Sequence, residues 1–115
     1  MAAKKQEVTS TYGSIFRAIE EKAGKIKFGR GFVATQITLT GNDSFQPLYV
    51  RVEDQVPEVA PYEYLNADFY LDSDVSVMAD ILNGKRGIYD AIEEGTVTVN
   101  GDAAKAAVFI HKLFG

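Results

Sequence analysis

The last third of the chain, residues 67–114, consists of short segments separated by glycines, and it constrains the fold more than any other part. Its pattern predicts a strand at 67–71 and a helix that begins at Asp72-Ser73-Asp74 and ends before Asn83-Gly84. A helix, a strand and a closing amphipathic helix are then expected, over residues 87–94, 96–99 and 103–114. Helices this short do not make a simple bundle, so we expect them to cover a sheet.

The first half of the chain predicts one helix and the remainder of that sheet. Residues 10–23 place apolar side chains at helical spacing, and Gly24 is a natural end for the helix. Residues 33–39 and 48–52 alternate apolar and polar side chains around the turn-forming run 41–44. This pattern predicts an antiparallel hairpin.

Prolines mark two places where strand pairing is expected to change. Pro47 lies at the start of the second strand of the hairpin and suggests either an edge strand or the beginning of a strand, because proline has no N–H to donate. Residues 54–66 contain two more prolines and are expected to form a connection, with a short extended piece at 56–60.

Length and composition limit the classes of function. The 115 residues correspond to one domain, which we place at residues 9–115 after a flexible terminus at 1–8. The net charge of −4 argues against a nucleic-acid partner, because such binding depends on neutralising phosphates. Basic residues gather between 22 and 30, where a solvated face is the simplest interpretation.

The sequence favours a cytoplasmic location. It has no cysteine, so disulfides, thiol catalysis and cysteine-based zinc sites are excluded, and a reducing compartment is expected. The N-terminus lacks the pattern of a secretory signal. The longest apolar run, residues 106–110, is far shorter than the about 20 residues that span a bilayer, so no stable membrane insertion is expected.

No group of residues forms a catalytic or metal-binding constellation. His111 is the only histidine and is expected at the rim of the last helix, without catalytic partners. Asp68, Asp72 and Asp74 lack the glycine and glutamate of a calcium loop and are better explained as helix caps. Residues 29–31 form a turn too short to cradle a phosphate. We therefore expect no catalytic residues, no metal and no cofactor.

The order of these elements resembles the sterol-carrier-protein-2-like (SCP2-like) family of lipid-binding domains. The resemblance is most specific over residues 84–114, where Asn83-Gly84-Lys85 is followed by a helix and by the pattern Gly-x-Val-x-Val-x-Gly-Asp at residues 95–102. The closing Lys112-Leu113-Phe114 is also similar to the end of the family. The resemblance implies an α+β fold with a five-stranded, mainly antiparallel sheet covered by helices. The peroxisomal signal of some members is not found at the end of this chain.

The resemblance also implies a function, which is non-catalytic binding or carrying of an apolar lipid in a cavity between sheet and helices. The lipid would be a fatty acyl chain, an isoprenoid or a sterol-like molecule. The side chains expected to line the cavity are apolar and come from the predicted strands and helices: Ile37, Phe69, Leu71, Met78, Leu82, Ile88, Ile92, Phe109, Ile110, Leu113 and Phe114. The last helix would act as a lid.

One alternative follows from the same residues. These apolar side chains can simply fill the core. The domain would then serve as an accessory module for protein–protein interaction, with a homodimer or another protein as its partner.

Overall fold

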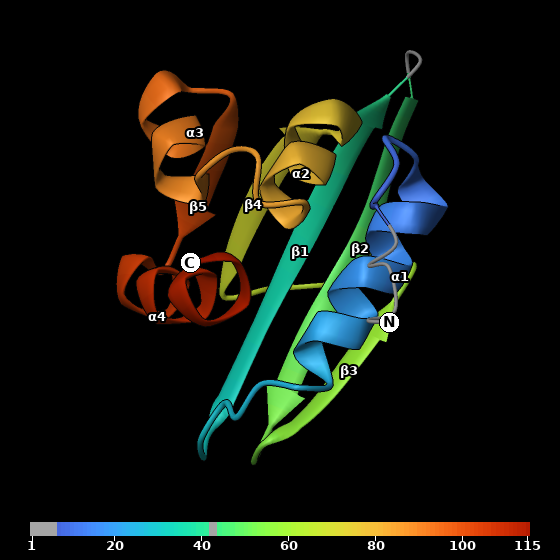
Figure 1. Ribbon diagram of the computed structural model, residues 1–115. Helices are drawn as coiled ribbons and strands as arrows, with labels where there is room; N and C mark the ends of the chain where they lie inside the picture. The colour runs from blue at the N-terminus through green and yellow to red at the C-terminus, as the bar shows by residue number, and fades with distance from the viewer. Residues whose placement is uncertain (1–6, 42–43) are drawn as a thin grey trace, which may run out of the picture.

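The computed structural model describes residues 7–41 and 44–115. In chain order, the elements are α1 (Tyr12–Ala23), β1 (Phe32–Gly41), β2 (Ser44–Glu53), β3 (Val56–Ala60), β4 (Phe69–Asp74), α2 (Val75–Leu82), α3 (Ile88–Glu94), β5 (Val97–Gly101) and α4 (Ala103–Phe114). The strands form one sheet in the order β3-β2-β1-β4-β5, and helices α1 and α2 lie over one of its faces (Figure 1). Only β1 and β4 pair in parallel, so the predicted α+β fold with a mainly antiparallel sheet is confirmed.

The central hairpin of β1 and β2 is longer than the alternating pattern indicated. Its pairing runs from Phe32↔Glu53 to Gly41↔Ser44. Residues 42 and 43, at the centre of the predicted turn, lie outside the described residues. Pairs such as Ile37↔Leu48 are fully buried beneath the helices. The period of two therefore predicted which face of the hairpin belongs to the core.

Pro47 does not mark β2 as an edge strand, because β2 lies between β3 and β1. The pairing of β3 stops at Tyr49↔Ala60, however, and Pro47 lies beyond this last pair. A proline is tolerated there because no ladder with β3 requires its missing N–H. Its carbonyl oxygen accepts a hydrogen bond from the Tyr12 hydroxyl of α1, at 2.7 Å.

Strand β3 is the short extended piece expected at residues 56–60. The turn that precedes it places both Asp54 and Gln55 at positive φ, of 44° and 76°. Two such residues in succession are typical of the tight turns that join antiparallel strands. Asp54 also donates its N–H to the carbonyl of Gly31, at 2.8 Å, and so ties this turn to the start of β1.

The connection from β3 to β4 carries the chain from one side of β1 to the other. Gln36 lies on the face of β1 opposite the buried Thr35 and Ile37, and its side-chain oxygen accepts a hydrogen bond from the N–H of Tyr64, at 3.0 Å. The connection therefore crosses the face that the helices leave uncovered. This crossover is the reason that β4 runs parallel to β1.

Helix α2 begins three residues later than predicted. Asp72 and Ser73 belong to β4, and Asp74 alone caps the helix, with its side chain accepting the N–H of Val77 at 2.8 Å. Leu82, which the sequence placed among the cavity-lining residues, is only partly buried, whereas its neighbour Ile81 is buried. Asp68 caps no helix, and its carboxylate accepts the N–H of Ala34 at 2.9 Å.

The pattern at residues 95–102 has a clear structural basis. Gly95 ends α3 in the left-handed conformation, at φ 81°. At Gly101 a Cβ would lie only 2.6 Å from the backbone of Asp68 and Phe69. Asp102 then caps α4 by accepting the N–H of Lys105, at 3.1 Å. The two glycines and the aspartate of the pattern thus serve a helix end, a close approach and a cap.

The described chain begins with a docked segment. Val8, which the sequence assigned to the flexible terminus, exchanges two hydrogen bonds of 2.8 Å with the side chain of Asn83. Lys85 forms an ion pair with Glu7 on the same segment. Residues 7 and 8 are therefore held against the end of α2.

Candidate functional site

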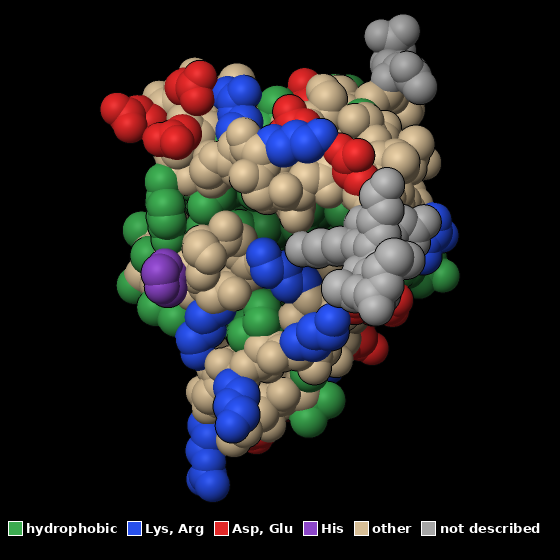
Figure 2. Space-filling model, in the orientation of Figure 1, with side chains coloured by type: hydrophobic (Ala, Val, Ile, Leu, Met, Phe, Trp, Pro, Cys, Tyr) green, Lys and Arg blue, Asp and Glu red, His purple; other side chains and the backbone are tan. Residues whose placement is uncertain are grey.

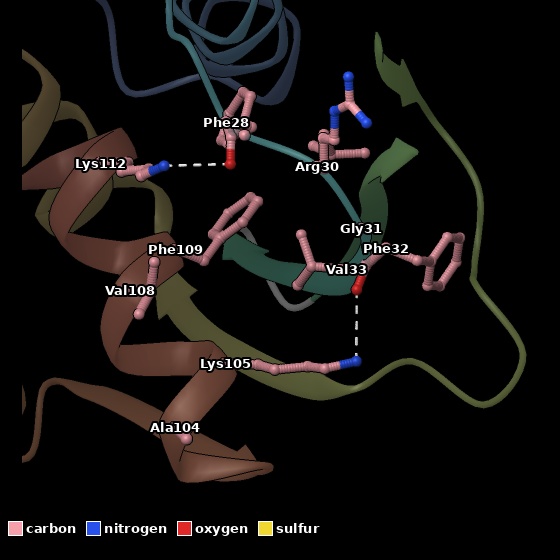
Figure 3. A pocket seen from close by; sticks show the side chains of 12 residues that line it. Phe28, Arg30, Gly31, Phe32, Val33, Ala104, Lys105, Val108, Phe109 and Lys112 are labelled. Carbon is pink, nitrogen blue, oxygen red and sulfur yellow. Dashed lines mark hydrogen bonds between the residues drawn. The ribbon is translucent and has the colours of Figure 1, made fainter. Parts of the chain in front are cut away.

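A cavity of about 290 Å³ opens at one end of the molecule, between α4 and the connection from α1 to β1 (Figure 3). In Figure 1 this is the lower end of β1. Its lining comes from the connection, the start of β1, the end of β2 and one face of α4: Phe28, Gly29, Arg30, Gly31, Phe32, Val33, Val52, Ala104, Lys105, Val108, Phe109 and Lys112.

The inner wall of the cavity is apolar and continuous with the core. Phe109 is buried, and its ring lies 5.7 Å from that of Phe28 and 5.5 Å from that of Phe69. Figure 3 shows Phe109 and Val33 directed into the space between α4 and β1. Val52 is also buried, whereas Val108 remains largely exposed at the mouth. Such a wall suits the hydrocarbon part of a ligand.

Two glycines shape the outer wall of the cavity. Gly29 and Gly31 have φ values of 80° and 105°, which residues with a Cβ rarely adopt. A Cβ at either position would meet nothing within 4 Å, so their role is backbone conformation rather than close packing. They bend the connection into the loop that faces α4.

Two lysines of α4 join the helix to that loop across the mouth of the cavity. The ammonium group of Lys112 donates to the carbonyl oxygens of Lys27 and Phe28, at 3.2 and 3.1 Å. The ammonium group of Lys105 donates to the carbonyl oxygen of Phe32, at 3.3 Å. Both bonds to residues that line the cavity are drawn in Figure 3.

The two lysines differ in their charged surroundings. Lys105 also forms an ion pair with Asp68, at 3.2 Å, which balances its charge. The ion pairs of the described residues include Lys105 but not Lys112.

Figure 2 shows Lys and Arg side chains gathered over the lower part of the face, and acidic side chains over the upper part near α3. The cavity therefore opens at the basic end of a molecule with a net charge of −4.

Two lining residues turn their side chains outward. Figure 3 shows Arg30 and Phe32 pointing away from α4. The Phe32 ring is 42% exposed and lies beneath the guanidinium group of Arg51, 5.4 Å from its carbon. This cation–π contact holds Phe32 on the uncovered face of the sheet. These two residues contribute mainly backbone to the cavity.

The structure places the eleven predicted ligand-binding residues in and around one core. Nine of them belong to a single buried cluster: Ile37, Phe69, Leu71, Met78, Ile88, Phe109, Ile110, Leu113 and Phe114. Leu82 and Ile92 are partly buried and pack against that cluster. Phe109 is the member of this set that lines the cavity. That the remaining members contact a ligand stays a prediction.

Sequence reasoning missed most of the cavity lining because the signal lies in segments without periodicity. Phe28 and Phe32 lie on either side of a glycine-rich turn and were assigned to no apolar stripe. Val108 lies off the centre of the α4 stripe, between the buried Ala106 and Phe109. Two phenylalanines that flank a pair of glycines, together with Val108 on the outer side of the last helix, are the sequence features that could have indicated the site.

A second hollow of about 660 Å³ lies between residues 7 and 8, α1 and Leu82. Charged side chains of both signs, including Arg17 and Glu21, form much of its wall. It is a polar surface groove and offers little to a hydrocarbon ligand.

The described residues offer few groups for catalysis. His111 is exposed, as expected, and its Nδ1 lies 3.2 Å from the Tyr89 hydroxyl. Within the described ranges, no three His, Asp or Glu side chains are grouped to hold a metal ion. No helix in this part of the chain is long and apolar enough to cross a membrane.

The sequence matches no protein-family model and no curated protein. Solved structures do share its fold. Palmitated SCP2L2 from Aedes aegypti has a TM-score of 0.77 and 15% identity, over 91% of this chain and 96% of its own. The apo form of sterol carrier protein 2 from Yarrowia lipolytica has a TM-score of 0.64 and 20% identity, over 94% of this chain and 99% of its own.

A similar domain occurs within a larger enzyme. The sec-alkylsulfatase Pisa1 from Pseudomonas sp. has a TM-score of 0.53 and 21% identity, over 83% of this chain but 14% of its own. Taken together, these similarities show that the chain has the SCP2-like fold, as the pattern at residues 84–114 predicted.

Proposed function

We propose that this protein binds or carries a lipid by holding one slim alkyl chain in the cavity between α4 and the α1–β1 connection. The observation that carries this proposal is the apolar inner wall formed around Phe109, which joins the cavity to the core. The SCP2-like fold supports lipid binding in general, and one structure with this fold is described as palmitated.

The size of the cavity favours a single alkyl chain over a sterol. Its volume of about 290 Å³ is near the lower limit of about 300 Å³ for small-molecule pockets. A flexible chain can follow such a space, whereas a rigid fused-ring body needs a wider one. Removing about 200 Å² of alkyl surface from water would contribute about 5 kcal/mol before the costs of association.

We also propose that the bound lipid is not chemically changed. The side chains that line the cavity include no hydroxyl, imidazole or carboxylate, and the ammonium groups of its two lysines, Lys105 and Lys112, are engaged with backbone carbonyl oxygens. The cysteine-free sequence is compatible with the proposed cytoplasmic location. Binding and release would therefore be the whole activity of the domain.

A fluorescent polyene fatty acid with an unbranched chain, such as parinaric acid, tests the proposal. We expect saturable binding by the delipidated wild-type protein, and binding at least tenfold weaker by Val33→Trp, which places an indole in the cavity. Val56→Trp is the matched control, because Val56 is 68% exposed on β3 and lies outside the cavity lining. Its affinity should equal that of the wild type.

Absence of saturable binding by the wild type would contradict the proposal and favour the accessory module with a filled core. Equal binding by Val33→Trp and the wild type would remove the cavity as the site. Circular dichroism of each variant would confirm that the fold is retained.

A further inference from the structure

The Lys112 end of the cavity combines a half-buried ammonium group with an apolar wall. Two of the three N–H donors of this group are used by the carbonyl oxygens of Lys27 and Phe28, at 3.2 and 3.1 Å. An ammonium group has three donors, so one remains for a further acceptor. Because Lys112 is itself part of the cavity lining, a bound molecule can reach it.

Among the residues that the structure describes, no carboxylate forms an ion pair with Lys112. Its ammonium group donates to two neutral carbonyl oxygens, whereas Lys105 at the other end of the cavity pairs with Asp68. A partly buried cation without a counter-ion favours an anion more strongly than one that is already paired. The two ends of the cavity thus differ in the charge that they would accept.

The helix sets the distance between these two ends. Lys105 and Lys112 are seven residues apart on α4, which corresponds to about 10 Å along the axis. Val108 and Phe109 lie between them on the same helix and provide apolar wall along this length. A ligand with a charged head and an alkyl tail can therefore lie along α4 with its two parts in matching surroundings.

We propose that Lys112 binds the anionic head group of an amphipathic lipid, so that the head lies at Lys112 and the tail extends past Phe109 toward Val52. This inference rests on the proposed function and adds the class of ligand to it. The head group is a small anion, such as a carboxylate or a phosphate monoester. A neutral alcohol of the same chain length gains the apolar contacts but not the charged one, and so binds more weakly.

Isothermal titration at about pH 8, where carboxylic acids are ionised and lysine is protonated, tests this preference. The wild-type protein is titrated with dodecanoate, with monododecyl phosphate and with dodecanol, each below its aggregation limit. We expect at least one of the two anions to bind about tenfold or more tightly than the alcohol, the usual worth of a hydrogen bond to a charged group. The anion that binds more tightly identifies the head group.

Three variants assign that preference to Lys112. Lys112→Met should reduce the preference for the anion over dodecanol to less than about threefold. Lys112→Arg should restore most of the preference. Lys105→Met makes the same replacement at the other lysine of α4 that lines the cavity, and it should keep the preference of the wild type for the anion.

The outcomes separate this inference from the function on which it rests. Equal binding of anions and alcohol by the wild type, or an unchanged preference in Lys112→Met, overturns the role of Lys112 while leaving lipid binding in place. A loss of dodecanol affinity in Lys112→Met would show that this lysine shapes the cavity and does not recognise the head group. Failure of all three ligands to bind would instead contradict the proposed function.

Discussion

At Gly101 the surrounding backbone leaves no room for a side chain. Its φ of 124° is strained for residues with a Cβ, and an added Cβ would lie 2.6 Å from the carbonyl oxygen of Asp68 and from the Cα of Phe69. These neighbours are backbone atoms, which cannot rotate away as a side chain can. Gly95 also has a positive φ, of 81°, but a Cβ there meets nothing within 4 Å.

The two glycines should therefore differ in their response to the same substitution. We expect Gly101→Ala to lower the free energy of unfolding by more than about 3 kcal/mol, because strain and overlap act together. Gly95→Ala should lower it by about 1–2 kcal/mol, the cost of the left-handed conformation alone. Urea unfolding followed by circular dichroism measures both values. Similar losses in the two variants would contradict the close approach at Gly101.

At the scale of single residues, the sequence predicted burial well where periodicity was regular. The four residues of α4 that the sequence placed among the cavity-lining side chains, Phe109, Ile110, Leu113 and Phe114, are all buried. In the eight-residue helix α2, Ile81 is buried, whereas Leu82, which was predicted to line the cavity, is only partly buried. A helix with little more than two turns gives too few residues to fix the orientation of its stripe.

At the scale of elements, α1 is tied to the sheet by a polar contact as well as by its apolar stripe. The half-buried Tyr12 donates its hydroxyl to the carbonyl oxygen of Pro47, at 2.7 Å. Burial raises the pKa of Tyr12 above its ordinary value of 10.0. The hydroxyl therefore stays protonated in the folded state at pH values where it ionises in the unfolded chain.

The stability contributed by Tyr12 should depend on pH in a defined direction. A raised pKa in the folded state means that this stability is fully present below about pH 10 and is lost as pH rises through the folded pKa. Tyr12→Phe should lower the free energy of unfolding by about 1 kcal/mol at neutral pH, and its difference from the wild type should shrink in alkali. Denaturant unfolding across this pH range measures the difference.

Two observations make that measurement decisive. Burial and a hydrogen bond to Glu58 also raise the pKa of Tyr49, so both proteins will lose some stability in alkali. The difference in unfolding free energy between the two proteins is therefore the quantity to follow. Tyr62→Phe is the control, because Tyr62 is 67% exposed and has no hydrogen bond to another described residue. A pH-independent difference between Tyr12→Phe and the wild type would contradict the role assigned to burial.

Most elements could be predicted from local sequence, and the exceptions have physical causes. The turn before β3 places Asp54 and Gln55 at positive φ without a glycine. The sequence therefore lacked the glycine that usually indicates a tight turn of this geometry. The parallel pairing of β1 with β4 depends on a crossover between residues distant in sequence, such as Gln36 and Tyr64. Element types are local properties, whereas pairing partners are set by the whole chain.

At the scale of the whole molecule, the cavity is a product of assembly. Its walls come from the α1–β1 connection, from β1 and β2, and from α4 near the other end of the chain. Periodicity identified the residues that fill the core between sheet and helices. Phe109 belongs both to this core and to the lining of the cavity. The position of the opening could not be predicted, because it depends on where a loop and a distant helix meet.

Because ligand binding and folding are linked in such a cavity, an alkyl ligand should stabilise the entire domain. At about 100 times the dissociation constant, a ligand that binds the folded state alone adds about 2.7 kcal/mol to the free energy of unfolding. For a chain of 115 residues this corresponds to an increase in Tm on the order of 10 °C. Differential scanning calorimetry with dodecanoate measures the increase.

Val33→Trp provides the control for this measurement, since its filled cavity should give little or no increase in Tm. An unchanged Tm for the wild type at a ligand concentration that saturates binding would contradict the coupling. An equal increase in both proteins would mean that the ligand acts elsewhere on the folded surface.

Strand β3 pairs with only part of β2, which affects how copies of this protein can contact one another at high concentration. Where β3 ends, a length of β2 could serve as a template for edge-to-edge aggregation. Pro47 brings no donor to that stretch, and Tyr12 already occupies its acceptor. A second polypeptide approaching this rim would therefore find neither a donor nor a free acceptor at residue 47, which disfavours edge-to-edge strand pairing there.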